Sequence, residues 1–325
     1  MKERVSILIP VYKAEQYISK CIRSVLGQTY ENIEVVIVDD ASPDNSMTIV
    51  NNAIESNELT QTNTGNGLNV TIIHNDRNMG IAATRNILLD NATGDYILFV
   101  DSDDYIEPDA VESLVGVAEK TGCDIVKCGY FEVKDNNVRT VSQKPWKDKT
   151  DLLKQHIKAW NSIEAMWQLM IKRSMIEKHQ IRFAEGINAS EDHLMMIKLY
   201  FYANSIADGK KPVYYYRIDN AQSVTHVNPK AFHDSMYKGM DNAINFLKEN
   251  GAYETYREEL LTRTFLTKQT FLLNKENRDI DLFVNTHPEC NSYYRRFCYN
   301  RKQRILFRLA ESGHGWLLKL ITSIL

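Results

Sequence analysis

The sequence predicts an α/β fold: a mostly parallel β-sheet of Rossmann-like type, flanked by helices and followed by a helical C-terminal extension. Short apolar runs alternate with amphipathic helical patterns over residues 5–130, which is typical of parallel strands buried under helices. Two of these runs end directly in acidic residues, at residues 39–40 and 101–104. Because ligands of such sheets bind at the carboxyl ends of the strands, we expect both acidic segments at one functional edge.

The expected strands are short and rich in β-branched residues, beginning with the run VSILIPV. They cover residues 5–11, 34–38, 70–73, 96–100 and 124–130. Between them, apolar residues recur with i, i+3, i+4, i+7 spacing, which indicates amphipathic helices. These helices cover residues 14–26, 47–54, 81–89 and 108–120.

Beyond about residue 228 the strand patterns stop. Helical patterns alone follow, at residues 231–248, 253–273 and 293–309. We therefore expect two domains. Residues 1–228 would form the α/β domain that carries the site, and residues 229–325 a helical region that is basic and amphipathic at its end.

The composition is that of an ordinary globular chain, with 43% apolar and 25% charged residues among 325. A formal net charge of −3 argues against nucleic acid as the main partner. The five cysteines form no Cys-x-x-Cys pair, which favours buried thiols in a reducing compartment. No apolar run reaches 18 residues and no signal-peptide pattern precedes the first strand. The sequence therefore predicts a cytoplasmic protein without a membrane-spanning helix.

The acidic segment at residues 101–104 carries a specific chemical signal. Clustered carboxylates at a sheet edge favour a neutralising cation, and oxygen ligands suit Mn²⁺ or Mg²⁺ bound together with substrate phosphates. The alternative is a solvated acidic turn that caps the next helix. Neither a Gly-x-Gly-x-x-Gly nor a Gly-x-x-x-x-Gly-Lys motif occurs. A nucleotide bound here would be held by side chains and a metal rather than by a glycine-rich loop.

Several motifs along the chain occur in a familiar order. They are the segment VSILIPVYKAEQ through VVIVDDASPD, then NMGIAATRN, then GDYILFVDSDD, and finally SED at residues 190–192. Together they resemble family-2 inverting glycosyltransferases of bacterial cell-surface polysaccharide synthesis, which have the GT-A fold. The resemblance is close over residues 4–130 and looser through residues 185–192 and 214–217. It implies a nucleotide-sugar-binding catalytic domain over residues 1–228.

The resemblance assigns a set of residues to the donor. It implies that Pro10 and Tyr12 lie against the nucleotide base and that Asp40 accepts a hydrogen bond from the uracil imide, as an acceptor-only carboxylate can. Arg85 would lie near the donor base or sugar, and Asp101 would contact ribose or the sugar. From the residues alone, Asp40 could equally cap a helix and Arg85 could lie on a solvated face.

The resemblance also supplies a metal ligand and a base. Asp103 would bind the Mn²⁺ or Mg²⁺ that bridges the donor phosphates, whereas Asp104 could simply begin the next turn. Asp192 would be the general base. Composition alone favours another interpretation of Glu191 and Asp192, namely carboxylates that stabilise the first turn of a helix capped by Ser190.

Three further residues are candidate contacts to the diphosphate or the acceptor: Glu191, Arg217 and His226. The family often uses the segment after the last strand to close over the diphosphate. His226 would then be a third metal ligand or an acceptor contact, and a solvent-exposed loop histidine is the open alternative.

The sequence thus predicts a metal-dependent inverting glycosyltransferase that moves a sugar from a nucleotide sugar, here a UDP-sugar, to a hydroxyl of a glycan or lipid-linked acceptor. One rival is a catalytically idle scaffold of the same fold in a polysaccharide synthase complex. Another is a glycoside hydrolase, which leaves Asp40, Arg85 and the acidic turn without a role. A nucleotidyltransferase would need a glycine- and lysine-rich phosphate loop that is absent.

The C-terminal end is basic, since residues 295–325 hold seven Lys or Arg and one Glu. One interpretation is a solvated helical face whose apolar stripe packs on the catalytic domain. The other is an interfacial helix that docks on anionic lipid, which would place the enzyme on the inner face of the cell membrane near a lipid-linked acceptor. We favour the second.

Overall fold

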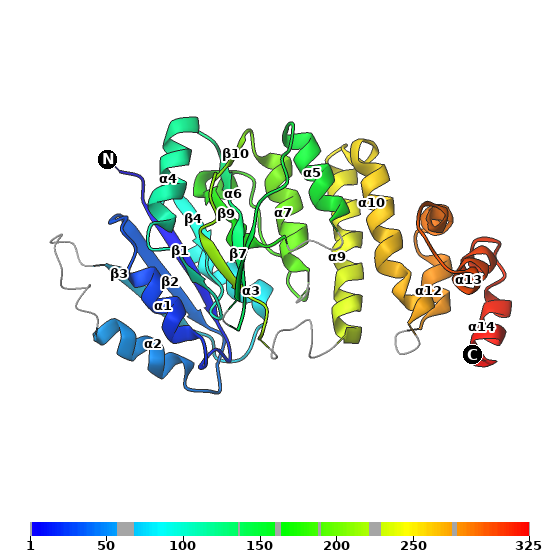
Figure 1. The fold of residues 1–325 in the computed structure, drawn as a ribbon, viewed down its shortest axis with the longest axis horizontal. Coiled ribbons are helices and arrows are strands. Elements are labelled where there is room, and N and C mark those ends of the chain that lie inside the picture. The colour runs from blue at the N-terminus through cyan, green and yellow to red at the C-terminus, as the bar shows by residue number, and fades with distance from the viewer. Residues whose placement is uncertain are drawn as a thin grey trace. The chain divides into compact units, whose positions relative to one another are not determined.

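The computed structural model describes residues 2–56, 68–135, 137–159, 164–187, 190–220, 229–274 and 278–324 (Figure 1). The chain divides into two compact units. The first unit comprises residues 1–149 and 164–223, and the second comprises residues 150–163 and 224–325. Each unit is described by itself.

The first unit contains a seven-stranded sheet in the order β10-β6-β9-β4-β1-β2-β3. Its strands are β1 (Val5–Val11), β2 (Ile33–Asp39), β3 (Asn69–His74), β4 (Tyr96–Phe99), β6 (Ile125–Lys127), β9 (Leu169–Lys172) and β10 (Ile206–Asp208). Neighbouring strands pair in parallel except that β9 runs antiparallel to β4 and β6. The mostly parallel sheet expected from the sequence is therefore confirmed, with one inserted antiparallel strand.

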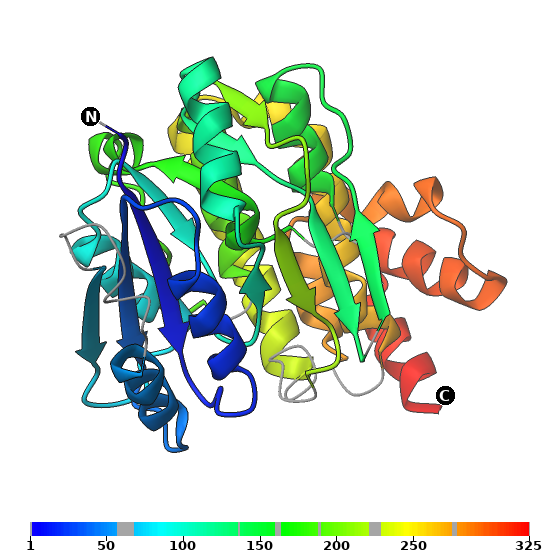
Figure 2. The same ribbon diagram turned by 60° about the vertical axis from the view of Figure 1, so that its left-hand side comes forward.

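Helices cover this sheet on two faces. They are α1 (Ile18–Leu26), α2 (Ser46–Glu55), α3 (Ile81–Asn91), α4 (Ala110–Thr121), α6 (Arg173–Lys178) and α7 (Glu191–Tyr202). Figure 2 shows α1 and α2 together on one face of the β1–β2–β3 part of the sheet and α3 on the other. The strand order runs from β1 through β2 to β3 and then reverses, because β4 lies on the other side of β1. Right-handed crossovers therefore place α1 and α2 on one face of the sheet and α3 on the other. That reversal places a ligand site at the carboxyl ends of β1 and β4.

A second, four-stranded sheet has the order β5-β11-β7-β8. Its strands are β5 (Tyr105–Ile106), β7 (Tyr130–Lys134), β8 (Asn137–Val141) and β11 (Tyr214–Arg217). The expected single strand at residues 124–130 is wrong, because this stretch divides between β6 of the large sheet and β7 of the small one. At the division, a Cβ on Gly129 would lie 2.8 Å from the carbonyl oxygen of Val141, so only glycine permits this close approach.

Two helix boundaries differ from the prediction for local reasons. The helix expected from residue 14 begins at Ile18, because the Ala14 N–H donates to the Ser46 Oγ at 2.9 Å and Lys13 has a positive φ of 53°. The helix expected at 293–309 divides into the 3-10 helix η3 (Pro288–Arg296) and α13 (Arg301–Glu311). Asn300 and Gln303 form a reciprocal capping box at the start of α13, and such a cap ends one segment and begins the next.

The second unit is helical. It contains α5 (Lys149–Lys158), α9 (Pro229–Glu249), α10 (Tyr253–Lys268), α11 (Thr270–Leu273), α12 (Ile280–Asn285), η3, α13 and α14 (Gly315–Ile324). Its core is aromatic: Phe265, Phe283 and Phe307 are each 0% exposed and pack on one another. Across the residues that the structure describes, no helix is both long and apolar enough to cross a membrane.

One buried carboxylate holds the amino-terminal edge of the large sheet together. Glu34, in β2, is 3% exposed. Its oxygens accept hydrogen bonds from the Ser6 hydroxyl, the Thr93 N–H at 2.6 Å and the Gly94 N–H at 3.0 Å, and Arg4 lies 3.3 Å away. Burial alone would raise the pKa of Glu34, but the hydrogen bonds from Ser6 and Thr93 outweigh it and lower this pKa below its ordinary value.

We therefore expect Glu34→Gln to lower the free energy of unfolding by about 1–3 kcal/mol at neutral pH, because the amide offers fewer acceptors to the same donors. A lowered folded-state pKa stabilises above the unfolded-state pKa of about 4.3, and this contribution is lost as the pH falls through the folded value. The free energy of unfolding of Glu34→Gln should therefore lack this decrease at acid pH. Urea unfolding between pH 3 and pH 7 measures both effects, with the exposed Glu31→Gln as the control. Equal stability of the two variants at neutral pH would contradict the prediction.

Candidate active site

The residues singled out from the sequence lie on elements whose ends meet at one edge of the large sheet. They are Pro10 and Tyr12 at the end of β1, Asp40 after β2, Arg85 in α3, Asp101 and Asp103 after β4, Glu191 and Asp192 at the start of α7, and Arg217 at the end of β11. His226 lies outside the described residues. The topology thus brings together residues from six separate segments of the chain.

The acidic turn after β4 is folded back on itself. The Asp104 N–H donates to the Asp101 carbonyl at 3.0 Å, which closes the turn. The three side chains then have different surroundings: Asp101 is 26% exposed, Asp103 is half-buried and Asp104 is 1% exposed. Burial raises the pKa of Asp103, with a further contribution from the charge of Asp101. A cation placed beside this turn would relieve that repulsion.

Asp104 ties the acidic turn to the second sheet. Its Oδ2 accepts a hydrogen bond from the Tyr214 hydroxyl at 2.9 Å, and its Oδ1 accepts one from the Arg217 N–H at 2.7 Å. The Tyr214 hydroxyl in turn accepts from the Asp101 N–H at 3.1 Å. Burial, with the charges of Asp103 and Asp101, raises the pKa of Asp104 well above its ordinary value. Asp104 therefore anchors β11 to the acidic turn, a structural role that the sequence pattern did not reveal.

Asp103 faces polar groups that follow β11. Its Oδ2 accepts a hydrogen bond from the Asn220 Nδ2 at 2.9 Å, and its carbonyl oxygen accepts one from the Arg217 Nε at 3.2 Å. The Arg217 guanidinium lies over the ring of Tyr17, 5.0 Å from its centroid. Arg217 thus places a cation beside the acidic turn. Asn220 is a neighbour of Asp103 that the sequence analysis missed, because no local pattern distinguishes it from an ordinary loop residue.

Arg85 is the centre of a buried ionic cluster. It is 3% exposed, and its guanidinium contacts three carboxylates. One nitrogen donates to the Asp101 Oδ1 at 3.0 Å, and the other donates both to the Glu191 Oε1 at 2.8 Å and to the Asp192 Oδ1. The Arg85 guanidinium also lies 5.9 Å and 5.5 Å from the ring centroids of Phe99 and Phe183. A single buried side chain thus joins the acidic turn after β4 to the first turn of α7.

The charges in this cluster shift one another. Burial alone would lower the pKa of Arg85, but the charges of Asp192, Asp101 and Glu191 outweigh it and raise this pKa, so the guanidinium stays charged. Burial raises the pKa of Glu191 to about 7, together with the charge of Asp192 and against that of Arg85. Burial also raises the pKa of Asp192, against the charge of Arg85. A carboxylate with a raised pKa is a stronger proton acceptor than an ordinary one.

Asp40 holds the loop that leads into α3. The carboxylate accepts hydrogen bonds from the Asn75 Nδ2 at 2.8 Å, the Met79 N–H at 2.7 Å and the Gly80 N–H at 3.0 Å. Gly80 has a φ of 85°, a conformation that glycine adopts without strain. Asp40 is 3% exposed, so the structure gives it a positioning role in this loop. Its contact with a nucleotide base stays a prediction.

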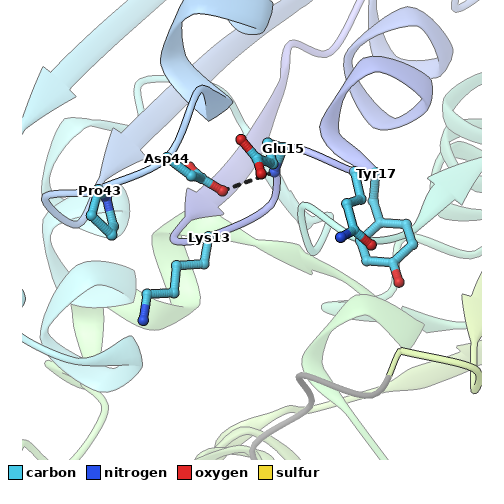
Figure 3. Close-up of a pocket in the computed structure, with 6 residues that line it drawn as sticks. Lys13, Glu15, Tyr17, Pro43 and Asp44 are labelled. Carbon is cyan, nitrogen blue, oxygen red and sulfur yellow. Dashed lines mark hydrogen bonds between the residues drawn. The ribbon is translucent and has the colours of Figure 1, made fainter.

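The segment that follows β1 lines a small hollow. Pro10 is buried in register with Val38, whereas Tyr12 is 42% exposed and available to a ligand. Beyond them, the loops after β1 and β2 enclose a space of about 130 Å³ (Figure 3). Its lining residues are Lys13, Glu15, Gln16, Tyr17, Pro43 and Asp44. Figure 3 shows the Asp44 carboxylate directed at the backbone of Glu15, whose N–H donates to it at 3.1 Å.

The donor set at the acidic turn fits a hard divalent cation bound mainly by a nucleotide. Among the described residues, no group of three or more His, Cys, Asp or Glu side chains is arranged to hold a metal ion alone. Mg²⁺ and Mn²⁺ commonly use only one or two carboxylates together with substrate phosphates. Asp103, with its pKa raised by burial and by Asp101, supplies such a carboxylate.

The fold and the acidic edge of the sheet define an α/β domain with a candidate site at the carboxyl ends of its strands. Residues 6–180 match the family description "Glycosyl transferase family 2". The chain is 33% identical over 278 residues to the putative glycosyltransferase EpsH of Bacillus subtilis, covering 83% of this chain and 77% of EpsH. The protein belongs to glycosyl transferase family 2 and is a glycosyltransferase, as the motifs predicted.

A second relative is the poly(ribitol-phosphate) beta-glucosyltransferase of Bacillus spizizenii, which is 30% identical over 301 residues. That match covers 90% of this chain and 44% of the relative.

Solved structures show the same fold. The crystal structure of Staphylococcus aureus TarS 1-349 in complex with UDP-GlcNAc matches with a TM-score of 0.70 at 22% identity, covering 96% of this chain and 91% of that one. The mannosyltransferase PcManGT of Pyrobaculum calidifontis, in complex with GDP-Man and Mn²⁺, matches with a TM-score of 0.53 at 15% identity, covering 100% and 88%. These likenesses confirm the expected GT-A fold with a C-terminal helical region.

Proposed function

We propose that this glycosyltransferase moves a sugar from a nucleotide sugar, a UDP-sugar, to a hydroxyl of a glycan or lipid-linked acceptor, with inversion at the sugar carbon and with Mn²⁺ or Mg²⁺ as cofactor. The observation that carries the proposal is the cluster around Arg85. The Arg85 guanidinium bonds both to the carboxylate of Asp101, in the turn expected to bind the donor, and to the carboxylate of Asp192, the expected base. The donor and the base that activates the acceptor would then lie side by side, as a direct displacement reaction requires.

In the proposed reaction Asp192 is the base, and the groups around it fix its orientation. Asp192 takes the proton from the acceptor hydroxyl as the acceptor oxygen attacks the anomeric carbon. The bond from that carbon to the diphosphate breaks at the same time, so the nucleoside diphosphate leaves from the opposite face and the configuration inverts. Arg85 fixes the orientation of Asp192 and Glu191, while the Met166 N–H donates to the other oxygen of Asp192 at 3.2 Å. No covalent enzyme intermediate is needed.

On the donor side, Tyr12 and Pro10 would lie against the base, and Asp40 would accept from the uracil imide. Asp103 would hold the metal, which when bound supplies positive charge to the departing diphosphate. Arg217, beside the acidic turn, would add a second cation near the phosphates, and Glu191 would contact the acceptor. TarS bound to UDP-GlcNAc and PcManGT bound to GDP-Man and Mn²⁺ support a nucleotide donor and a divalent metal.

The acceptor would belong to a cell-surface polysaccharide. A relative named for transfer to poly(ribitol-phosphate) supports an acceptor chain of this class. We also propose that the enzyme works in the cytoplasm and contacts the inner face of the cell membrane through its C-terminal region, where lipid-linked acceptors are available. Family membership supports a transferase over a glycoside hydrolase.

Calorimetric titration of UDP with and without Mn²⁺ tests the donor site. We expect binding that requires the metal, and we expect Asp103→Asn to weaken it by at least about 10–100-fold, because loss even of a group that only orients a metal ligand typically costs this much in metal affinity. Asp90→Asn, on an exposed part of α3, removes the same charge and should bind UDP normally.

The outcomes separate the alternatives. Binding of another nucleotide in place of UDP would keep the enzyme class and change the donor. Equal affinity of Asp103→Asn and the unaltered protein would overturn the role of Asp103. No binding to any nucleotide sugar would favour the idle scaffold.

A further inference from the structure

The basic side chains near the C-terminus fall into two groups. Three of the seven lie in ion pairs, which join Arg295 to Glu311 at 2.6 Å, Lys319 to Asp281 at 2.6 Å and Arg296 to Glu258. The remaining four are Arg301, Lys302, Arg304 and Arg308, all exposed on α13. Within the described part of the chain, none of these four has an acidic partner. The unneutralised charge of the C-terminal end is therefore concentrated on one helix.

Three arginines of this helix share one face with an apolar residue. Arg301, Arg304, Ile305 and Arg308 follow i, i+3, i+4, i+7 spacing and so lie within an arc of roughly 100°. We call this set the arginine face. Ile305 is 49% exposed, whereas Ala310, on the opposite side of α13, is 2% exposed and, with Phe307 at 0%, packs into the core of the unit. The arginine face is thus turned to solvent by the packing of the helix itself.

The arginine face surrounds a hollow. Its four residues, with Tyr299, line a space of about 360 Å³. Three guanidinium groups lie around an isoleucine and a tyrosine. At a bilayer surface, phosphates lie above the first acyl carbons, so the guanidinium groups correspond to the phosphates and the apolar side chains to the acyl carbons. The next helix, α14, adds two exposed apolar side chains one turn apart: Trp316 is 68% exposed and Leu320 is 54% exposed. Tryptophan is enriched at such interfaces.

We propose that the arginine face docks on an anionic phospholipid bilayer, with the arginines on lipid phosphates and Ile305 and Tyr299 against the acyl boundary. A soluble polyanion would be bound by the arginines alone and would gain nothing from an exposed isoleucine at their centre. The inference deepens the membrane contact proposed above and does not depend on the assignment of the donor or the base.

Vesicle co-sedimentation of the full chain tests the proposal. We expect binding to vesicles with 30% phosphatidylglycerol in phosphatidylcholine and none to phosphatidylcholine alone. Each arginine near an anionic surface contributes about 1 kcal/mol, or about fivefold. The variant with Arg301→Gln, Arg304→Gln and Arg308→Gln should therefore bind about 100-fold more weakly. Ile305→Ser should weaken binding as well. A charge-matched control is the variant with Lys120→Gln, Lys178→Gln and Lys210→Gln, all exposed in the first unit, which should bind as the unaltered protein does.

Three results would overturn the proposal. They are equal vesicle binding by the arginine variant and the lysine control, absence of binding by the unaltered protein, and binding that soluble polyphosphate abolishes while Ile305→Ser leaves it intact. The last result would identify a polyanion rather than a bilayer as the partner. Circular dichroism verifies folding of each variant, and UDP titration of the same samples keeps this test separate from the test of the donor site.

Discussion

Asp192→Asn is expected to reduce sugar transfer by roughly 10²–10⁴-fold while UDP binding is retained, because an amide cannot take the proton from the acceptor hydroxyl. The asparagine side chain is nearly isosteric and can still accept from the Met166 N–H, which lies 3.2 Å from the present carboxylate. Burial raises the pKa of Asp192. Transfer by the unaltered enzyme should therefore fall on the acid side, and the fall should begin at a higher pH than an ordinary aspartate would give.

Glu191→Gln is the matched comparison. It removes one carboxylate from the same guanidinium of Arg85 and leaves the proposed base in place, while loss of the proposed Glu191 contact with the acceptor should raise the KM for the acceptor. Turnover and UDP affinity measured across pH distinguish the two variants. If the kcat of Glu191→Gln at saturating acceptor fell as far as that of Asp192→Asn, a general loss of charge balance around Arg85 would explain both, and the assignment of Asp192 would be wrong.

Arg85→Gln is expected to lower the free energy of unfolding by about 3–5 kcal/mol, because removing one partner of a buried ionic cluster leaves the others uncompensated. Arg85 is 3% exposed and contacts Asp101, Glu191 and Asp192. Without the guanidinium these carboxyl groups would take up protons, since burial already raises the pKa of Glu191 to about 7. Transfer should then be lost at neutral pH even where the variant remains folded.

Arg182→Gln provides the control for this experiment. Arg182 pairs with Asp90 at 2.8 Å, but its side chain is 40% exposed and that of Asp90 is 58% exposed. Exposed pairs of this type contribute about 0–1 kcal/mol. Urea unfolding of both variants gives the comparison. A loss in Arg85→Gln no larger than in Arg182→Gln would show that the buried cluster does not stabilise the fold.

Periodicity was sufficient to predict most elements of the parallel sheet. The runs that became β1, β2 and β4 are mostly apolar, because both faces of these strands are buried. The same local pattern could not predict β9. Its residues Leu169–Lys172 form a short apolar run that equally suits a helix, and only pairing with β4 and β6 makes it an antiparallel strand. The division of residues 124–130 between two sheets likewise depends on a close approach at Gly129, which involves Val141 of β8, the strand that pairs with β7.

For the site, too, some features follow from the sequence and others only from the tertiary structure. The sequence by itself determined the types of chemical group and their positions at strand ends: aspartates after β2 and β4, an arginine in α3 and two carboxylates at the start of α7. Only the tertiary structure decided that Arg85 joins Asp101 to Asp192 and that Asp104 anchors Tyr214. It also decided that three of the C-terminal basic residues are neutralised, whereas the arginine face of α13 has no acidic partner among the residues that the structure describes. The physical reason is that a charged group acquires its role from the charges around it, and these neighbours can lie 107 or 110 residues away along the chain.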